Sequence, residues 1–157
     1  MELELRWKKP LHLIDGSEWQ MIYCLDEDDE DSIPEEPGIY VFGRKFGDSF
    51  VPLYIGQAKN LCSRIGNQFN NLRLMRGIED AESGKRLLVF AEFYAKPGQQ
   101  LAKCLDIIES ALIENALTQG FELLNKQGTK TPTHALNFSG ARDGARIFSK
   151  EMYVRAR

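Results

Sequence analysis

Glu109 is the residue whose surroundings in this sequence point most strongly to chemistry. It lies in the segment 99–118, whose apolar residues recur at helical spacing, and Leu112 and Ile113 place it at the edge of the apolar stripe. A carboxylate there is costly to desolvate unless a cation or hydrogen bonds compensate it. We therefore expect Glu109 to have a partner, either a metal ion at a catalytic site or a structural ion pair. Glu114, on the polar face of the same segment, is expected to be solvated.

Arg64, Tyr40 and Tyr54 are further candidates because of the elements on which they lie. The two tyrosines belong to neighbouring predicted strands, and Arg64 belongs to the predicted helix that follows. Arginine suits phosphate recognition because its planar fork binds two oxygens and stays charged at any working pH. Taken singly, each residue is better explained as an ordinary core tyrosine or surface arginine.

Predicted strands and helices alternate along the part of the chain that carries these candidate residues. A helix is predicted from an N-cap at Asn60 to about Met75, and a second over about 99–118, with Gly120 just past its end. Segment 16–25 fits a short helix or a strand. Strands are predicted from alternating or β-branched runs at 2–7, 38–42, 50–55 and 87–94, the middle two as an antiparallel hairpin. We expect an α/β (α+β) fold with a small three-stranded, largely antiparallel sheet flanked by helices.

Length and composition indicate one globular domain. The chain has 157 residues, 43% hydrophobic and 27% charged, and no apolar run approaches the length of a membrane span. The N-terminus lacks the basic and apolar regions of a signal peptide. Three well-separated cysteines are expected to be free buried thiols. We therefore expect a cytoplasmic protein with no membrane partner.

Charge is distributed unevenly along the chain. The net charge is −3, yet segment 25–37 holds eight acidic residues and no basic one, whereas 126–157 holds seven basic and two acidic residues. The acidic run is expected to be a solvated, mobile loop. Without it the body of the chain is weakly basic, which permits a phosphate-facing surface.

Several common site motifs are absent from the sequence. It contains no GxGxxG, Walker loop, HExxH, GxSxG or CxxC pattern, so dinucleotide, zinc-protease and α/β-hydrolase chemistry lack their usual marks. His12 and His134 have no paired ligand nearby in the sequence and do not predict a metal site.

The tripeptides Gly38-Ile39-Tyr40 and Tyr54-Ile55-Gly56 resemble the signature of the GIY-YIG nuclease superfamily. Residues 54–65 are similar to the corresponding stretch in the N-terminal nuclease domain of bacterial excision-repair UvrC. The segment from Glu109 to Ile113, with Asn125 downstream, resembles the metal-binding glutamate and following asparagine of that family. Order, spacing and the predicted strand–strand–helix–strand–helix pattern agree with the resemblance.

The resemblance covers about residues 34–125 and implies a domain plan. We expect a single domain over 1–157, with a GIY-YIG nuclease core at 34–125, an N-terminal extension with the acidic loop at 1–33 and a basic C-terminal extension at 126–157.

The resemblance also implies a role for each matching residue. Glu109 would be the sole protein ligand of one divalent cation, Mg²⁺ or Mn²⁺, with waters completing the shell. Tyr40 would activate or position the attacking water, and Tyr54 would hydrogen-bond the reaction centre. Arg64 would stabilise charge on the scissile phosphate, and Asn125 would orient the site. The reaction would be one-metal, in-line hydrolysis of a phosphodiester in DNA, with RNA not excluded.

Two glutamines depart from the family pattern. Gln57 stands where the excision-repair domain has lysine, and Gln68 stands where many relatives carry histidine or tyrosine. Because glutamine cannot act as a base, proton transfer would fall to Tyr40 or to water, and the rate would be lower by roughly 10²–10⁴. The alternative hypothesis is a catalytically weak relative that binds nucleic acid or a partner protein.

Basic and polar residues around the core and in the tail are further expected contacts to nucleic acid. Arg142, Arg146 and Lys150 step by four, so a helix would align them as a clamp on backbone phosphates. A solvated terminal helix packed by Ile147 and Met152 is an equal alternative. The full set of these expected contacts is Lys59, Gln57, Gln68, Arg142, Arg146 and Lys150.

Overall fold

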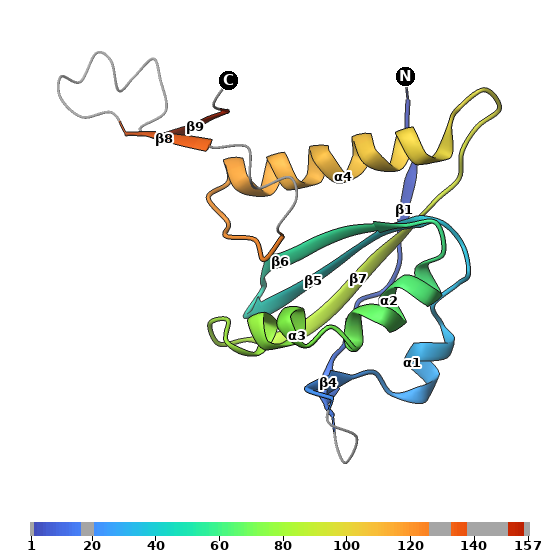
Figure 1. The fold of residues 1–157 in the computed structure, drawn as a ribbon. Helices are drawn as coiled ribbons and strands as arrows, with labels where there is room; N and C mark the ends of the chain where they lie inside the picture. The colour runs from blue at the N-terminus through green and yellow to red at the C-terminus, as the bar shows by residue number, and fades with distance from the viewer. Residues whose placement is uncertain (1, 17–20, 126–132, 138–150, 156–157) are drawn as a thin grey trace.

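The computed structural model describes residues 2–16 and 21–125, together with backbone strands at 133–137 and 151–155 (Figure 1). Three strands form its central antiparallel sheet in the order β6-β5-β7, and these are β5 (Gly38–Phe46), β6 (Ser49–Ala58) and β7 (Lys85–Phe93). Two short strands, β1 (Leu5–Trp7) and β2 (Leu11–His12), pair with the other side of β7. The predicted antiparallel three-stranded sheet and the α+β class are thus confirmed, and the N-terminal segment adds two strands.

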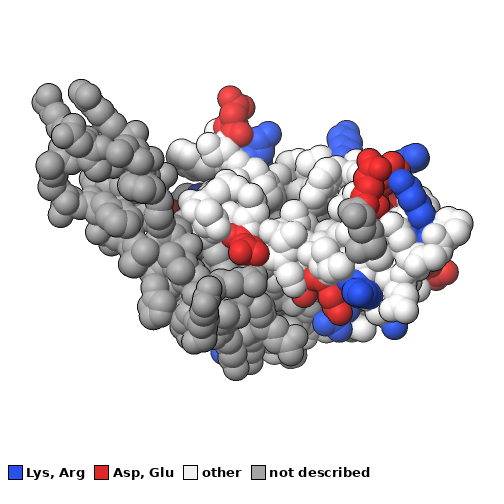
Figure 2. All heavy atoms as spheres, turned by 90° about the horizontal axis from the view of Figure 1, so that it is seen from above, with Lys and Arg blue, Asp and Glu red and all other residues white. Residues whose placement is uncertain are grey.

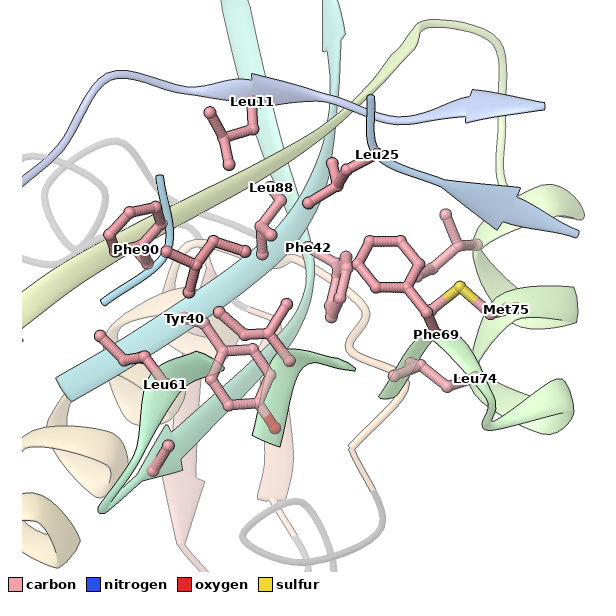
Figure 3. Close-up of a cluster of buried hydrophobic side chains, with 14 of the residues drawn as sticks. Leu11, Leu25, Tyr40, Phe42, Leu61, Phe69, Leu74, Met75, Leu88 and Phe90 are labelled. Carbon is pink, nitrogen blue, oxygen red and sulfur yellow. The ribbon is translucent and has the colours of Figure 1, made fainter. Parts of the chain in front are cut away.

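Helices cover both faces of this sheet (Figure 1), and they are α2 (Leu61–Phe69) and α3 (Leu72–Glu79) on one face and α4 (Leu101–Thr118) on the other. The alternation along β5 explains the division, because successive strand residues point to opposite faces. Ile39 and Val41 pack with α4, whereas Tyr40 and Phe42 pack with α2 and α3 (Figure 3). The strand that carries Tyr40 is therefore buried on both sides.

The predicted helix from Asn60 to Met75 is wrong as a single element. Asn60 does cap α2, since its side chain accepts a hydrogen bond from the Ser63 amide at 3.0 Å. Asn71 then caps a new helix by accepting from the Leu74 amide at 3.2 Å. The Asn71 side chain satisfies a free amide in the first turn of α3. The chain therefore begins a second helix and does not extend α2.

The acidic run also differs from the prediction of a mobile loop. Its first half forms the short helix α1 (Glu27–Asp31), and the Asp26 side chain caps it by accepting from the Asp29 amide at 2.8 Å. Carboxylates in a first turn face the positive end of the helix dipole, which favours the helix despite their mutual repulsion. Before it, β3 (Ile14–Asp15) pairs with β4 (Tyr23–Cys24), so the end of segment 16–25 is strand.

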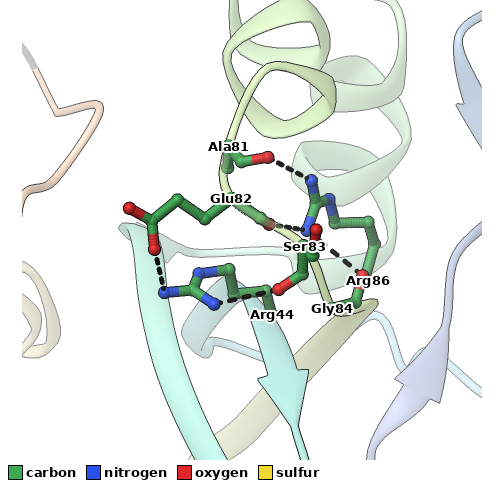
Figure 4. Close-up of polar contacts among 6 residues, drawn as sticks. All are labelled: Arg44, Ala81, Glu82, Ser83, Gly84 and Arg86. Carbon is green, nitrogen blue, oxygen red and sulfur yellow. Dashed lines mark hydrogen bonds and ion pairs between the residues drawn. The ribbon is translucent and has the colours of Figure 1, made fainter.

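Two arginines close the loop between α3 and β7 (Figure 4). Arg44 and Arg86 are cross-strand partners on β5 and β7, a pairing of like charges that is unfavourable by itself. Arg86 donates to carbonyl oxygens of the loop, including that of Ala81 at 2.8 Å, and Arg44 pairs with the Glu82 carboxylate at 3.2 Å. The Glu82 carboxylate offsets the charge of Arg44, and carbonyl oxygens of the loop hold the Arg86 guanidinium, so the two arginines have a structural role here.

The remaining predictions concern the tail, the cysteines and membranes. In the tail, β8 (Thr133–Asn137) pairs with β9 (Glu151–Arg155). Because Met152 lies in β9, the predicted terminal helix does not extend over 151–155. Arg142, Arg146 and Lys150 lie outside the described residues. The cysteines are free as predicted, although Cys62 is exposed and Cys104 is the buried one. Across the part of the chain that the structure describes, no helix is both long and apolar enough to span a bilayer.

Candidate active site

A pocket of about 660 Å³ brings predicted site residues together from four elements, β5, β6, α2 and α4, and from the segment after α4. All five residues to which the resemblance assigns a catalytic role line this pocket, and they are Tyr40, Tyr54, Arg64, Glu109 and Asn125. Gln57 also lines it. Residues that are separated by up to 85 positions in sequence therefore share one cavity wall.

The tyrosine pair forms the floor of this pocket. Tyr40 on β5 is fully buried, and its ring stacks on that of Tyr54 with centroids 6.1 Å apart and planes at 29°. Burial raises the pKa of Tyr40 to about 12, although hydrogen bonding from Gln68 and the charge of Arg64 act in the opposite direction. At neutral pH Tyr40 is therefore a neutral phenol.

Gly56 makes room for the Tyr40 ring. The two residues are cross-strand partners, and a Cβ atom at position 56 would lie 2.3 Å from the Tyr40 Cζ atom. The ring therefore lies directly over the glycine. The glycine of the second tripeptide thus positions the tyrosine of the first.

Replacing Gly56 with alanine is therefore expected to destabilise the fold and displace Tyr40. Overpacking of this kind costs about 1–3 kcal/mol in unfolding free energy, which urea denaturation measures. Gly66 on α2 is the matched control, since a Cβ there would meet no atom within 4 Å. Gly66→Ala should instead stabilise the protein by about 0.5–1 kcal/mol, because alanine is the better helix former. Equal effects of the two substitutions would contradict the close contact.

A side-chain amide lies behind the tyrosines. Gln68 on α2 is 5% exposed, and its Nε2 atom donates to the Tyr40 hydroxyl at 2.7 Å and to the Tyr54 hydroxyl at 3.4 Å. Its Oε1 atom accepts from Asn71 Nδ2 at 3.2 Å. Gln68 is not among the pocket-lining residues. The structure thus buries Gln68 against the hydroxyl groups of the two tyrosines.

Arg64 projects from α2 and is largely exposed. Hydrogen bonding and electrostatic attraction from Tyr40 raise the pKa of its guanidinium, with smaller contributions in the same direction from Tyr54 and Glu109. The side chain therefore keeps its charge in the pocket. A cation at this point suits a bound phosphate oxygen.

Glu109 on α4 is half-buried, as its position at the edge of the apolar stripe predicts. Burial raises the pKa of its carboxyl, and the nearby charge of Asp106 adds to this, while Gln57 and Arg64 oppose it. Glu114 on the same helix is exposed. The two glutamates therefore differ as the sequence periodicity predicts.

The raised pKa of Glu109 predicts a pH-dependent loss of stability. The folded state binds a proton at Glu109 more tightly than the unfolded state, so stability falls as pH rises from the ordinary glutamate pKa through the raised one. Without a metal ion, Glu109→Gln should lack this loss and be the more stable protein at neutral pH. Urea midpoints measured across that range test this, and parallel pH profiles for both proteins would contradict it.

Two amides tie β6 to its neighbours. Gln57 donates to the Asp106 carboxylate on α4 at 2.5 Å, so the position that carries lysine in the excision-repair domain here joins sheet to helix. Asn125 donates to the Ile55 carbonyl at 2.6 Å and accepts from the Ile55 amide at 3.1 Å. Asn125 thereby holds the backbone between Tyr54 and Gly56, which is a positioning contact.

The pocket fits one hard divalent cation. Among the described residues that line it, Glu109 alone carries a carboxylate, and it is accompanied by two guanidinium groups and several amides. In the described part of the chain there is no cluster of three or more His, Cys, Asp or Glu side chains suited to a metal. Mg²⁺ accepts this kind of sparse oxygen set because it keeps several waters. Zinc, which requires three or four protein ligands, fits poorly.

Two pocket residues were missed from the sequence. Asn71 and Arg73 line the cavity from the start of α3. The signal for Asn71 was the pair Asn70-Asn71 directly after the apolar stripe of α2, a composition typical of a helix stop and restart. Arg73 carried no separate signal, because its place depends on that restart. Lys59 is exposed and is not among the pocket-lining residues.

Sequence comparison shows that part of this chain is similar to UvrABC system protein C. The chain is 44% identical over 46 residues to UvrABC system protein C of Petrotoga mobilis, and 39% identical over 61 residues to that of Thermotoga petrophila. The predicted resemblance to UvrC is thereby confirmed. The two segments are 29% and 38% of this chain but 8% and 10% of the relatives, so the chain matches about a tenth of their length.

Solved structures include the GIY-YIG N-terminal endonuclease domain of UvrC from Thermotoga maritima, bound to its catalytic divalent cation, magnesium. It is 28% identical to this chain, and the match covers 57% of this chain and 88% of that domain with a TM-score of 0.41. A point mutant of the same domain, also bound to its catalytic divalent cation, has a TM-score of 0.40. No family model matches the chain.

Proposed function

We propose that this protein is a divalent-cation-dependent endonuclease that hydrolyses phosphodiester bonds in DNA. The observation that carries the proposal is that Tyr40, Tyr54, Arg64, Glu109 and Asn125 line a single pocket in a chain with a UvrC-like motif. None of these side chains indicates catalysis by itself. Their combination supplies a metal-binding carboxylate, a phosphate-binding guanidinium and hydroxyl groups within one cavity.

The roles follow from the chemistry of each group. Glu109 would hold one Mg²⁺ or Mn²⁺, which when bound supplies a Lewis acid for the phosphate and a more acidic water. Arg64 would bind the scissile phosphate and stabilise the charge that builds up on it. Tyr54, which is half-buried at the pocket, would hydrogen-bond the reacting group, and Asn125 would keep Tyr54 in place through the Ile55 backbone.

The described part of the face on which α4 lies carries no long basic track. Figure 2 shows acidic and basic side chains interspersed over the described part of the face on which α4 lies. Such a mixture is a poor surface for following a phosphate backbone, because affinity for it comes from clustered cations. Arg73, which is exposed and lines the same pocket as Arg64, is suited to a phosphate next to the scissile one.

The test is a cleavage assay on supercoiled plasmid, branched duplex and RNA. Nicking of DNA with Mg²⁺ or Mn²⁺, and none after chelation, is the expected result. If no substrate is cut above the metal-free control while the protein is folded, the endonuclease proposal is wrong.

The second candidate function is a nucleic-acid- or protein-binding module with weak or no catalysis. Gln57 and Gln68 favour it, because both are held in structural hydrogen bonds and neither can accept a proton as a base. This candidate predicts DNA binding that weakens with salt, no cleavage, and the same affinity in Glu109→Gln.

A further inference from the structure

The hydrogen bonds beneath the tyrosine pair run in one direction. The backbone amide of Leu74 can only donate, so the Asn71 atom 3.2 Å from it is the carbonyl oxygen Oδ1. The Nδ2 group of Asn71 therefore faces Gln68, and the Gln68 atom at 3.2 Å is its carbonyl oxygen Oε1. The Nε2 group of Gln68 is left to face the Tyr40 hydroxyl at 2.7 Å. The cap of α3 thus decides the orientation of both amides.

This direction determines what the Tyr40 hydroxyl can do. A neutral phenol has one proton to donate and an oxygen that accepts. Gln68 Nε2 is a donor only and lies 2.7 Å from the Tyr40 oxygen, and the Arg64 guanidinium, also a donor only, lowers the pKa of this phenol. Gln68 therefore uses an accepting position of Tyr40, and the hydroxyl proton is what Tyr40 can offer to another group.

We propose that Asn71 and Gln68 are positioning residues that occupy an accepting position of the Tyr40 oxygen and so direct the Tyr40 hydroxyl proton toward the phosphate or water in the pocket. The proposal rests on the proposed nuclease function for its catalytic meaning. The hydrogen-bond direction itself does not, and it is testable without substrate. Gln68 cannot act as a base, unlike the histidine or tyrosine of many relatives, but it has a defined positioning role in this proposal.

Two further observations support this role. Tyr40 lines the pocket although its side chain is buried, and this burial raises its pKa to about 12, which disfavours its ionisation at neutral pH. Gln68 is itself 5% exposed, so its amide has few partners other than Asn71 and the two tyrosines. A buried amide of this kind keeps its orientation only while its neighbours dictate it.

The test follows the ionisation of residue 40 directly. A fluorinated tyrosine at position 40, whose phenol is more acidic, is titrated by fluorine NMR in the full chain without metal or DNA. Asn71→Ser keeps a neutral cap for α3, but the shorter side chain lacks the Nδ2 group that donates to Gln68, which frees the Gln68 amide to present its oxygen to the phenol. Gln68→Leu removes the amide altogether. Asn60→Ser, the same change at the cap of α2, is the matched control.

The expected result is that the pKa at position 40 rises by about one in Asn71→Ser and in Gln68→Leu and is unchanged in Asn60→Ser. If Gln68→Leu does not fold, the comparison of the two serine variants decides alone. An unchanged or lowered pKa in Asn71→Ser, or an equal rise in Asn60→Ser, would overturn the proposal.

Cleavage kinetics separate this inference from the proposed function. Asn71→Ser should lower kcat by about tenfold with KM unchanged, because it alters a group that acts in the reaction and not in binding. A fall in kcat/KM through KM alone would overturn the role in catalysis. If the wild type cleaves nothing, the nuclease proposal fails, and the titration still decides whether Asn71 sets the direction of the network.

Discussion

Glu109→Gln is expected to reduce metal-dependent DNA cleavage by at least about 10²-fold, which is the size of effect seen when one electrostatic group is removed from an active site. The glutamine has the same shape but carries no charge for a cation. Since Glu109 is the carboxylate among the described pocket-lining residues, the loss has no obvious substitute there. Nicking of supercoiled plasmid, measured with excess enzyme and varied Mg²⁺, checks this.

Glu114→Gln provides the matched control. It makes the same change on the same helix, five residues further on, at an exposed position that does not line the pocket. It should cut at the wild-type rate. If both variants cut as the wild type does, Glu109 has no part in catalysis. If both lose activity equally, the effect comes from the charge of α4 and not from the pocket.

Arg64→Lys is expected to lower kcat by about 10²–10³-fold while the fold is retained. Lysine keeps the charge but loses the planar fork that binds two phosphate oxygens. It also removes the guanidinium interaction with Tyr40. Single-turnover cleavage separates this loss from any change in product release, and circular dichroism checks the fold.

Arg76→Lys on α3 is the control for the arginine substitution. Arg76 is exposed and is not among the residues that line the pocket. It should leave the cleavage rate unchanged within about twofold, as for most surface changes. Wild-type activity in Arg64→Lys would show that charge alone is required, and the proposed two-oxygen contact would then be wrong.

Periodicity singled out Glu109 in the sequence, and the resemblance to the GIY-YIG family added Tyr40, Tyr54, Arg64 and Asn125. The helical spacing of apolar residues separated Glu109 from Glu114, and the structure has the first half-buried and the second exposed. The β-branched and aromatic run at 38–42 predicted a strand, and in a strand successive residues such as Ile39 and Tyr40 point to opposite faces. Such regularities are local, so a single sequence contains them.

The parts that sequence did not predict depend on contacts between distant segments. The stripe from Leu61 to Leu72 suggested one helix, but Asn71 caps a second one and leaves Leu72 50% exposed. The orientation of the Gln68 amide depends on the Asn71 cap. Because the sequence did not predict this cap, it did not predict that Gln68 donates to Tyr40 either. Pairing of β1 and β2 with β7 likewise involves residues about 80 apart, for which alternation gives no register.

The most direct test of this account is whether a divalent cation binds in the pocket beside Glu109. Crystals soaked in Mn²⁺ and measured at a wavelength where manganese scatters anomalously would locate it. We predict one anomalous peak at the Glu109 carboxylate, within the cavity that Tyr40 and Arg64 also line, and no such peak in Glu109→Gln crystals. A peak elsewhere, or none at a Mn²⁺ concentration that supports cleavage, would contradict the account.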